Sequence, residues 1–176
     1  MSTLDTLCKR KSVRSYNGEQ ITEEELNKIV KAGQASPCGM MQYDKMNITV
    51  ISNKDLLREI DEAGAKMFGK LDMHPLYGVP TLALVSAQQP DKMMENMVYS
   101  NAAIIAHDMA LEAVELGVGS CYIWGAVAAL FQSPEVMAKL NLPEGYIPCC
   151  AIGLGHTDEK YSEREITDRI KVNKID

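Results

Sequence analysis

The sequence lacks the patterns that mark several classes of protein. It contains no run of 18 apolar residues, so we expect no transmembrane helix, and residues 1–15 contain no apolar core of a secretory signal. It has no internal repeat and no low-complexity tract, which excludes a solenoid and a disordered linker. The five cysteines are odd in number and include no CxxC pair, so we expect a reduced, cytoplasmic chain without a disulfide framework.

An excess of positive charge is also missing. Eighteen Lys and Arg against 24 Asp and Glu give a formal net charge of −6, which argues against nucleic-acid and anionic-membrane partners. The histidines at positions 74, 107 and 156 are far apart, so we expect no metal site. No Gly-x-Ser-x-Gly, P-loop or His-Glu-x-x-His motif occurs.

What remains is the composition of an ordinary globular protein. The 176 residues are 46% hydrophobic and 24% charged, so we expect one domain over residues 1–176. Helical and strand patterns intermix along the chain, which indicates an α-β layered domain. We predict helices over residues 22–33, 52–62, 91–116, 127–131 and 134–140, and strands over residues 46–51, 81–86, 120–124 and 146–154.

The longest predicted helix indicates that the chain associates with another. Apolar residues recur every three or four positions from Met94 to Leu116, and the chain contains 11 methionines. This is more apolar surface than one small domain buries easily. We therefore expect a dimer.

A short basic segment is the first candidate site. Residues 9–14 contain four of the 18 basic residues. In an extended backbone, Arg10, Ser12 and Arg14 project to one side, where two guanidinium forks and a hydroxyl can chelate a phosphate. A solvated basic arm is the alternative, and this segment alone does not decide between them.

Two other segments suit a flat ligand. Residues 117–125 (GVGSCYIWG) follow a helix and enter a strand, which is the wrong order for a dinucleotide fingerprint. Trp124 and Gly125 either present backbone amides to a ligand or form a core turn. Residues 35–42 (ASPCGMMQ) let a backbone approach a ligand closely. A nucleophilic Cys38 needs a base or a cation that the sequence does not supply, so we assign no catalytic residue.

Taken together, these segments resemble the FMN-dependent nitroreductase family. The match is collinear over nearly the whole chain, although each motif alone is weak. The matching segments are residues 10–16 (RKSVRSY, like R-R-S-[VI]-R-x-[FY]), 22–26 (TEEEL), 35–41 (ASPCGMM, like A-P-S-x-x-N), 77–81 (YGVPT, like F-x-G-A-P), 117–125 (like G-L-G-S-C-W-I-G) and 153–155 (GLG, like G-x-G-[YH]).

The resemblance implies an α+β, three-layer α-β-α fold, with a central mixed, mainly antiparallel sheet flanked by helices. It also implies a homodimer with two FMN molecules at the interface, each contacted by both chains. Arg10, Ser12 and Arg14 would grip the phosphate, with Lys11 at a usual Arg position. The further cofactor contacts would be Pro37, Cys38, Gly39 and Met41 from the partner chain, Ile123, Trp124 and Gly125 at the isoalloxazine edge, and Arg164, or else Lys160, from the tail.

The activity implied is that of an FMN-dependent oxidoreductase. It would transfer a hydride from NAD(P)H through the flavin to a nitroaromatic, quinone or similar acceptor, with ping-pong kinetics. Cys38 and Met41 stand where Ser and Asn are common, and the usual Q-P-W is absent, so the substrate-side wall differs. The alternatives are a specialised acceptor (reductive dehalogenation, ene reduction or flavin itself as substrate) and a non-catalytic flavin-binding module.

Overall fold

The computed structural model describes residues 2–167 and 170–175. In chain order, the helices and strands are α1 (Thr3–Lys9), α2 (Glu23–Ala35), β1 (Met46–Ile51), α3 (Lys54–Met67), β2 (Thr81–Gln88), α4 (Glu95–Glu115), β3 (Gly119–Ile123), α5 (Gly125–Leu130), α6 (Pro134–Lys139) and β4 (Tyr146–Gly155), with two short 3-10 turns, η1 (Gly39–Met41) and η2 (Tyr43–Lys45), before β1.

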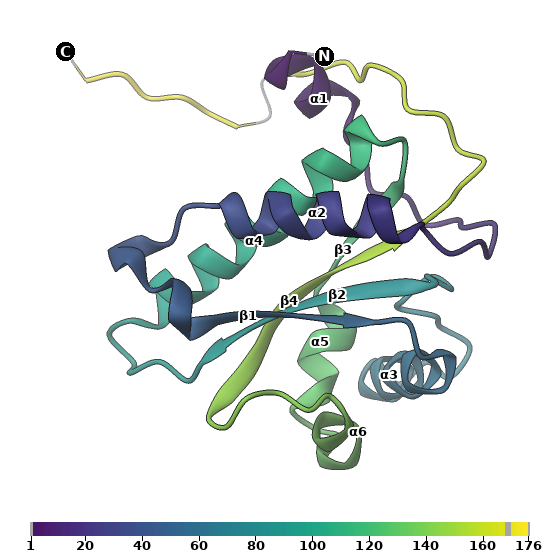
Figure 1. Ribbon diagram of the computed structural model, residues 1–176, viewed down its shortest axis with the longest axis vertical. Coiled ribbons are helices and arrows are strands. Elements are labelled where there is room, and N and C mark those ends of the chain that lie inside the picture. Colours follow the sequence, from purple (N-terminus) through teal and green to yellow (C-terminus); the bar gives the residue numbers. More distant parts are fainter. Residues whose placement is uncertain (1, 168–169, 176) are drawn as a thin grey trace.

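The four strands form one sheet between two layers of helices. The strand order is β1-β2-β4-β3, and each neighbouring pair is antiparallel. Helices α2 and α4 cover one face, while α3, α5 and α6 lie on the other (Figure 1). The central strands β2 and β4 are buried on both faces, which explains their continuous apolar sequences. The three-layer fold expected from the resemblance is confirmed.

All predicted helices and strands are present, although α4 begins at Glu95 and not at residue 91. Two larger differences concern α1 and α3. Helix α1 was not predicted, because its 7 residues are too few to show a periodicity; it begins at a capping box between Ser2 and Asp5. Helix α3 continues to Met67 rather than ending near residue 62. Gly64 lies inside this helix, and a Cβ at this position would lie 2.5 Å from Cγ of Pro75. Gly64 is therefore a site of close packing and not a helix stop.

The core has two parts, one on each face of the sheet. One cluster joins α2 and α4 to the sheet through residues such as Ile29 and Met109, and the other joins α3 and α5 through Ile60 and Leu130. The outer side of helix α4 is mixed: Tyr99 and Ile104 are exposed apolar residues among exposed polar residues such as Asn96, Ser100 and His107. Two large apolar side chains of this helix therefore lie in water.

The structure also bears on the membrane and thiol expectations. Among the described residues, no helix combines the length and hydropathy needed to cross a bilayer. All five cysteines are free thiols, and four of them are buried.

Candidate flavin site

The basic segment runs along the outer edge of β3. Helix α1 ends as the backbone turns extended at Arg10. Val13 is fully buried, and its amide donates to the carbonyl of Ser120 at 2.8 Å. Ser12 and Arg14, on either side of Val13, both act on the Cys121 thiol, where they partly offset the rise in its pKa that burial causes. The predicted alternation therefore places Ser12 and Arg14 on one side of an extended strand.

The segment after β4 runs back along this basic segment. Oγ1 of Thr157 donates to the carbonyl of Ser15 at 2.7 Å, and the Arg164 amide donates to the carbonyl of Cys8 at 3.1 Å. The guanidinium of Arg164 also donates to the carbonyl of Leu7 at 3.0 Å. In Figure 1 this segment arches from the end of β4 to α1. The fold thus brings Arg164 beside the start of the basic segment.

Tyr77 contacts the basic segment from the loop before β2. The Arg14 guanidinium lies 5.5 Å from the centroid of the Tyr77 ring, a cation-π distance. Hydrogen bonding with Tyr77 is the main cause that raises the pKa of Arg14, followed by the Cys121 thiol. The backbone of Tyr77 is left-handed, with φ of 57°, and Gly78 follows with φ of 69°. A tight turn therefore aims the Tyr77 ring at Arg14.

Lys11 is engaged by a carboxylate that the sequence analysis missed. Its Nζ lies 2.8 Å from Oε2 of Glu159, and this contact is the main cause that holds the pKa of Glu159 below its usual value. The backbone amide of Arg14 contributes to the same shift. Glu159 follows no motif, and only the return of the tail places it here. It would oppose an anion bound at this cluster.

Replacing this carboxylate should strengthen phosphate binding. In Glu159→Gln, Lys11 loses its counter-charge and one negative charge leaves the cluster. We expect FMN to bind roughly two- to fivefold more tightly, since the pair is partly exposed. Titration calorimetry at two ionic strengths measures this, and the gain should shrink at high salt. Weaker binding would mean that Glu159 orders the cluster and does not compete with the ligand.

Gly119 lies where β3, the end of β4 and the basic segment meet. A Cβ here would lie 2.9 Å from the carbonyl oxygen of Gly155, 2.9 Å from Cγ2 of Thr157 and 3.1 Å from Cγ1 of Val13. We predict that Gly119→Ala lowers the free energy of unfolding by about 1–3 kcal/mol, because the backbone oxygen cannot move aside without breaking the strand pairing. Urea unfolding measures this. Gly18→Ala, at an exposed glycine, separates overpacking from loss of a positive φ, because Gly18 has open space around an added Cβ and φ of 86°.

The residues at the end of β3 have different environments. Ile123 is buried, whereas the Trp124 side chain is 63% exposed and forms an apolar hollow of 390 Å³ with neighbours including Tyr99 and Phe131. Trp124 is thus not a core residue. The Phe68 ring packs on Gly125, where a Cβ would lie 2.6 Å from it. Two aromatic side chains therefore flank Gly125, and Phe68 was not among the predicted residues.

The loop after α2 is held by a buried amide. Oδ1 of Asn101, on α4, accepts from the Gly39 amide at 2.9 Å, and Asn101 is only 3% exposed. Its Nδ2 has no hydrogen-bond partner in the described part of the chain. The next residues, Met40 and Met41, are both left-handed, with φ of 56° and 54°, and both side chains are exposed. A single buried side chain thus anchors a strained, apolar loop.

Cys38 is not an activated thiol. Burial raises its pKa, and no cation is among the causes of the shift. A nucleophilic cysteine needs the opposite environment.

The structure brings one group of predicted residues together and leaves the other apart. Ser12 and Arg14 flank Val13, which pairs with β3, and Arg164 lies against the end of α1, just before Arg10. Residues 37–41 lie beyond the C-terminal end of α2, whereas the basic segment precedes its N-terminal end (Figure 1). Within the described residues there is also no group of three or more His, Cys, Asp or Glu side chains that could hold a metal ion.

Comparisons with known proteins converge on one family. Residues 7–156 match the model of the family described as the nitroreductase family. The fold superposes on a nitroreductase with bound FMN from Bacteroides fragilis, with a TM-score of 0.82 and 28% identity over 99% of this chain and 100% of that chain. A putative NADH dehydrogenase/NAD(P)H nitroreductase of Methanothermobacter thermautotrophicus is 26% identical over 98% of this chain and 86% of its own length. The FMN reductase (NADPH) of Bacillus subtilis is 26% identical over 88% of this chain, which spans 66% of that relative.

Proposed function

Because the chain belongs to the nitroreductase family, we propose that it is an FMN-dependent oxidoreductase that passes a hydride from NAD(P)H to a nitroaromatic, quinone or similar acceptor. One observation carries this proposal. The tail returns along the basic segment, so Arg164 lies against Leu7 and Cys8, just before the segment that carries Arg10, Ser12 and Arg14, although it comes from the opposite end of the sequence.

The residues at this edge fit the phosphate end of FMN. The three arginines supply planar donors that match phosphate oxygens, and Ser12 supplies a hydroxyl. Lys11 belongs to the same cluster, although Glu159 holds its ammonium group. When bound, FMN supplies reversible two-electron chemistry, and the protein supplies binding, orientation and electrostatics.

The rest of the proposed site needs a second chain. Ile123, Trp124 and Gly125 would border the flavin ring in one subunit. Pro37, Cys38, Gly39 and Met41 of the partner subunit would cover it. Several large apolar side chains are exposed, among them Tyr99 and Ile104 of α4, Met40 and Phe131. Their exposure supports a homodimer, because monomeric proteins rarely leave large apolar patches in water.

The first test is the absorption spectrum of the purified protein, with the released chromophore identified by mass. We expect FMN at close to one molecule per chain. Steady-state kinetics with NADH or NADPH and menadione or nitrofurazone then test the mechanism. Donor and acceptor that occupy the same site in turn give parallel double-reciprocal lines, and intersecting lines would reject this sequence of events.

A second candidate function is reduction of free flavin. Two relatives from Bacillus subtilis are named FMN reductases, which favours flavin itself as the acceptor. Stopped-flow oxidation of NADPH with FMN in large excess distinguishes the two functions. A flavin reductase consumes many FMN molecules per chain, whereas the leading proposal expects rates that do not rise once the site is saturated.

A further inference from the structure

A second cavity lies between α3 and the loop before β2. Its volume is 940 Å³, in the upper range of small-molecule sites. The apolar part of its wall includes Leu57, Leu76 and Val79, all nearly fully buried. Lys54, Arg58 and His74 supply polar groups. None of the residues assigned above to FMN lines this cavity.

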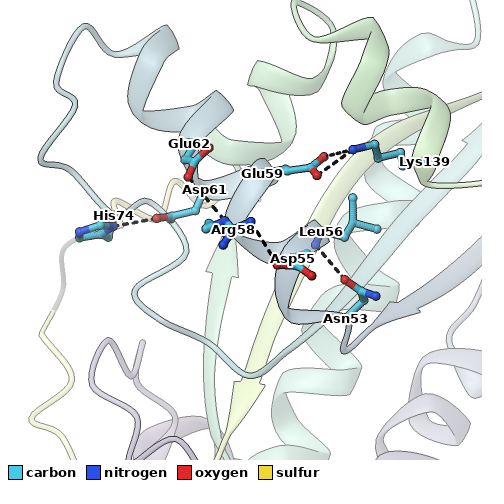
Figure 2. Close-up of polar contacts among 9 residues, drawn as sticks. All are labelled: Asn53, Asp55, Leu56, Arg58, Glu59, Asp61, Glu62, His74 and Lys139. Carbon is cyan, nitrogen blue, oxygen red and sulfur yellow. Dashed lines mark hydrogen bonds and ion pairs between the residues drawn. The ribbon is translucent and has the colours of Figure 1, made fainter.

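The wall of the cavity is fixed by Asp61. One carboxylate oxygen accepts from the Leu76 amide at 2.7 Å, and the other lies 2.8 Å from Nδ1 of His74. Figure 2 shows His74 reaching Asp61 on α3, so this contact ties the loop to the helix. On the opposite side, Nε2 of Gln20 donates to the carbonyl of Pro80 at 3.0 Å. The hollow is therefore preformed, which lowers the ordering cost of binding.

The cavity lining holds one cation that no carboxylate engages among the described residues. Both oxygens of Asp61 are already engaged, and Arg58 is shared between Asp55 and Glu62 at 3.1 and 3.7 Å (Figure 2). In the described part of the chain, Lys54 forms no ion pair. Nε2 of His74 is the ring nitrogen that Asp61 leaves unused. An apolar wall with an unpaired ammonium suits a ligand with a hydrophobic body and one negative group.

We propose that this cavity binds a small aromatic carboxylate, with its ring against Leu57, Leu76 and Val79 and its carboxylate at Lys54. The loop that carries Tyr77 separates the cavity from Arg14, so the carboxylate and FMN bind at the same time. This site is additional to the proposed flavin site and does not depend on it.

A matched pair of probes tests the proposal. Titration calorimetry compares 2-naphthoate with the neutral 2-naphthamide on the full chain, first as purified and then with excess FMN. We expect saturable binding of 2-naphthoate, and binding of 2-naphthamide that is about three- to fivefold weaker, the range for losing a partly exposed ion pair. Lys54→Met should abolish this preference, while Lys66→Met, an exposed lysine of the same helix outside the cavity, should preserve it.

A variant that narrows the cavity is a second test. Met73→Trp places a larger side chain in the lining and should weaken binding of both probes, with the melting temperature showing that the fold is kept. Absence of 2-naphthoate binding, or equal binding of the two probes, would overturn the proposal. Displacement of 2-naphthoate by FMN would also overturn it, because the probe would then occupy the flavin site. FMN binding is measured separately, by the absorbance of the bound FMN. A failure of the flavin proposal can therefore be distinguished from a failure of the cavity proposal.

Discussion

Arg14→Ala is expected to weaken FMN binding by about 2–4 kcal/mol, the range for removing one partner of a charge-assisted contact. Arg14 is exposed, and its guanidinium is oriented by the Tyr77 ring and not by an ion pair. Its truncation therefore leaves no buried group without a partner. The unfolding free energy of the flavin-free protein should stay within about 0.5 kcal/mol of the wild type, as for other surface substitutions.

Two variants separate the contribution of the planar Arg14 guanidinium to FMN affinity from the contribution of positive charge alone. Arg14→Lys keeps the charge and loses the planar pair of donors, so its affinity should fall between that of the wild type and that of Arg14→Ala. Lys31→Ala removes one positive charge from the exposed side of α2, and FMN affinity should not change. Fluorescence titration of FMN measures all three. An Arg14→Ala protein that binds FMN as tightly as the wild type would remove Arg14 from the phosphate site.

Most of the fold could be predicted from local patterns. Period-two and apolar runs located the four strands, and the capping box of Thr22 and Glu25 located the start of α2. The differences have two causes. Helix α1 is too short to show a periodicity, and Gly64 resembles a helix stop in the sequence, whereas in the structure it is the place where Pro75 packs closely on α3.

Some features of the candidate site could likewise be predicted from local patterns, and others could not. The spacing of Ser12 and Arg14 predicts that they lie on one side, because extended backbone alternates its side chains, and both act on the Cys121 thiol. Glu159, Tyr77 and Phe68 reach the site through chain reversals, and their roles could not be deduced from spacing. Asn101 was missed for a related reason: within an apolar helix, one amide has no sequence signal that distinguishes a loop anchor from a polar surface residue.

Asn101→Ala is expected to weaken FMN binding about 5- to 30-fold, although Asn101 is not placed against the flavin. Its Oδ1 holds Gly39, and the two left-handed methionines that follow are strained by about 1–2 kcal/mol. Without the anchor this strain relaxes, and the binding-competent loop becomes a minor population. The unpartnered Nδ2 makes Asn101 costly to bury, so its loss should lower the unfolding free energy by no more than about 1–2 kcal/mol.

Ser100→Ala is the matched control, because its hydroxyl only donates to the carbonyl of Asn96 within α4. Its FMN affinity and stability should both equal those of the wild type. If Asn101→Ala loses stability but binds FMN normally, Asn101 has a structural role alone. Equal affinity losses in both variants would point to a general disturbance of α4.

A mixed dimer of Arg14→Ala and Asn101→Ala subunits then tests whether the site is shared between chains. In a symmetric dimer, one site combines the phosphate cluster of the first chain with the loop of the second, and the other site has the reverse combination. If the loop acts on the partner's flavin, both defects fall in one site and the other is intact. Half of the sites should then bind FMN with wild-type affinity. If each chain binds FMN alone, both sites carry one defect each, and titration of the purified heterodimer should detect no wild-type site.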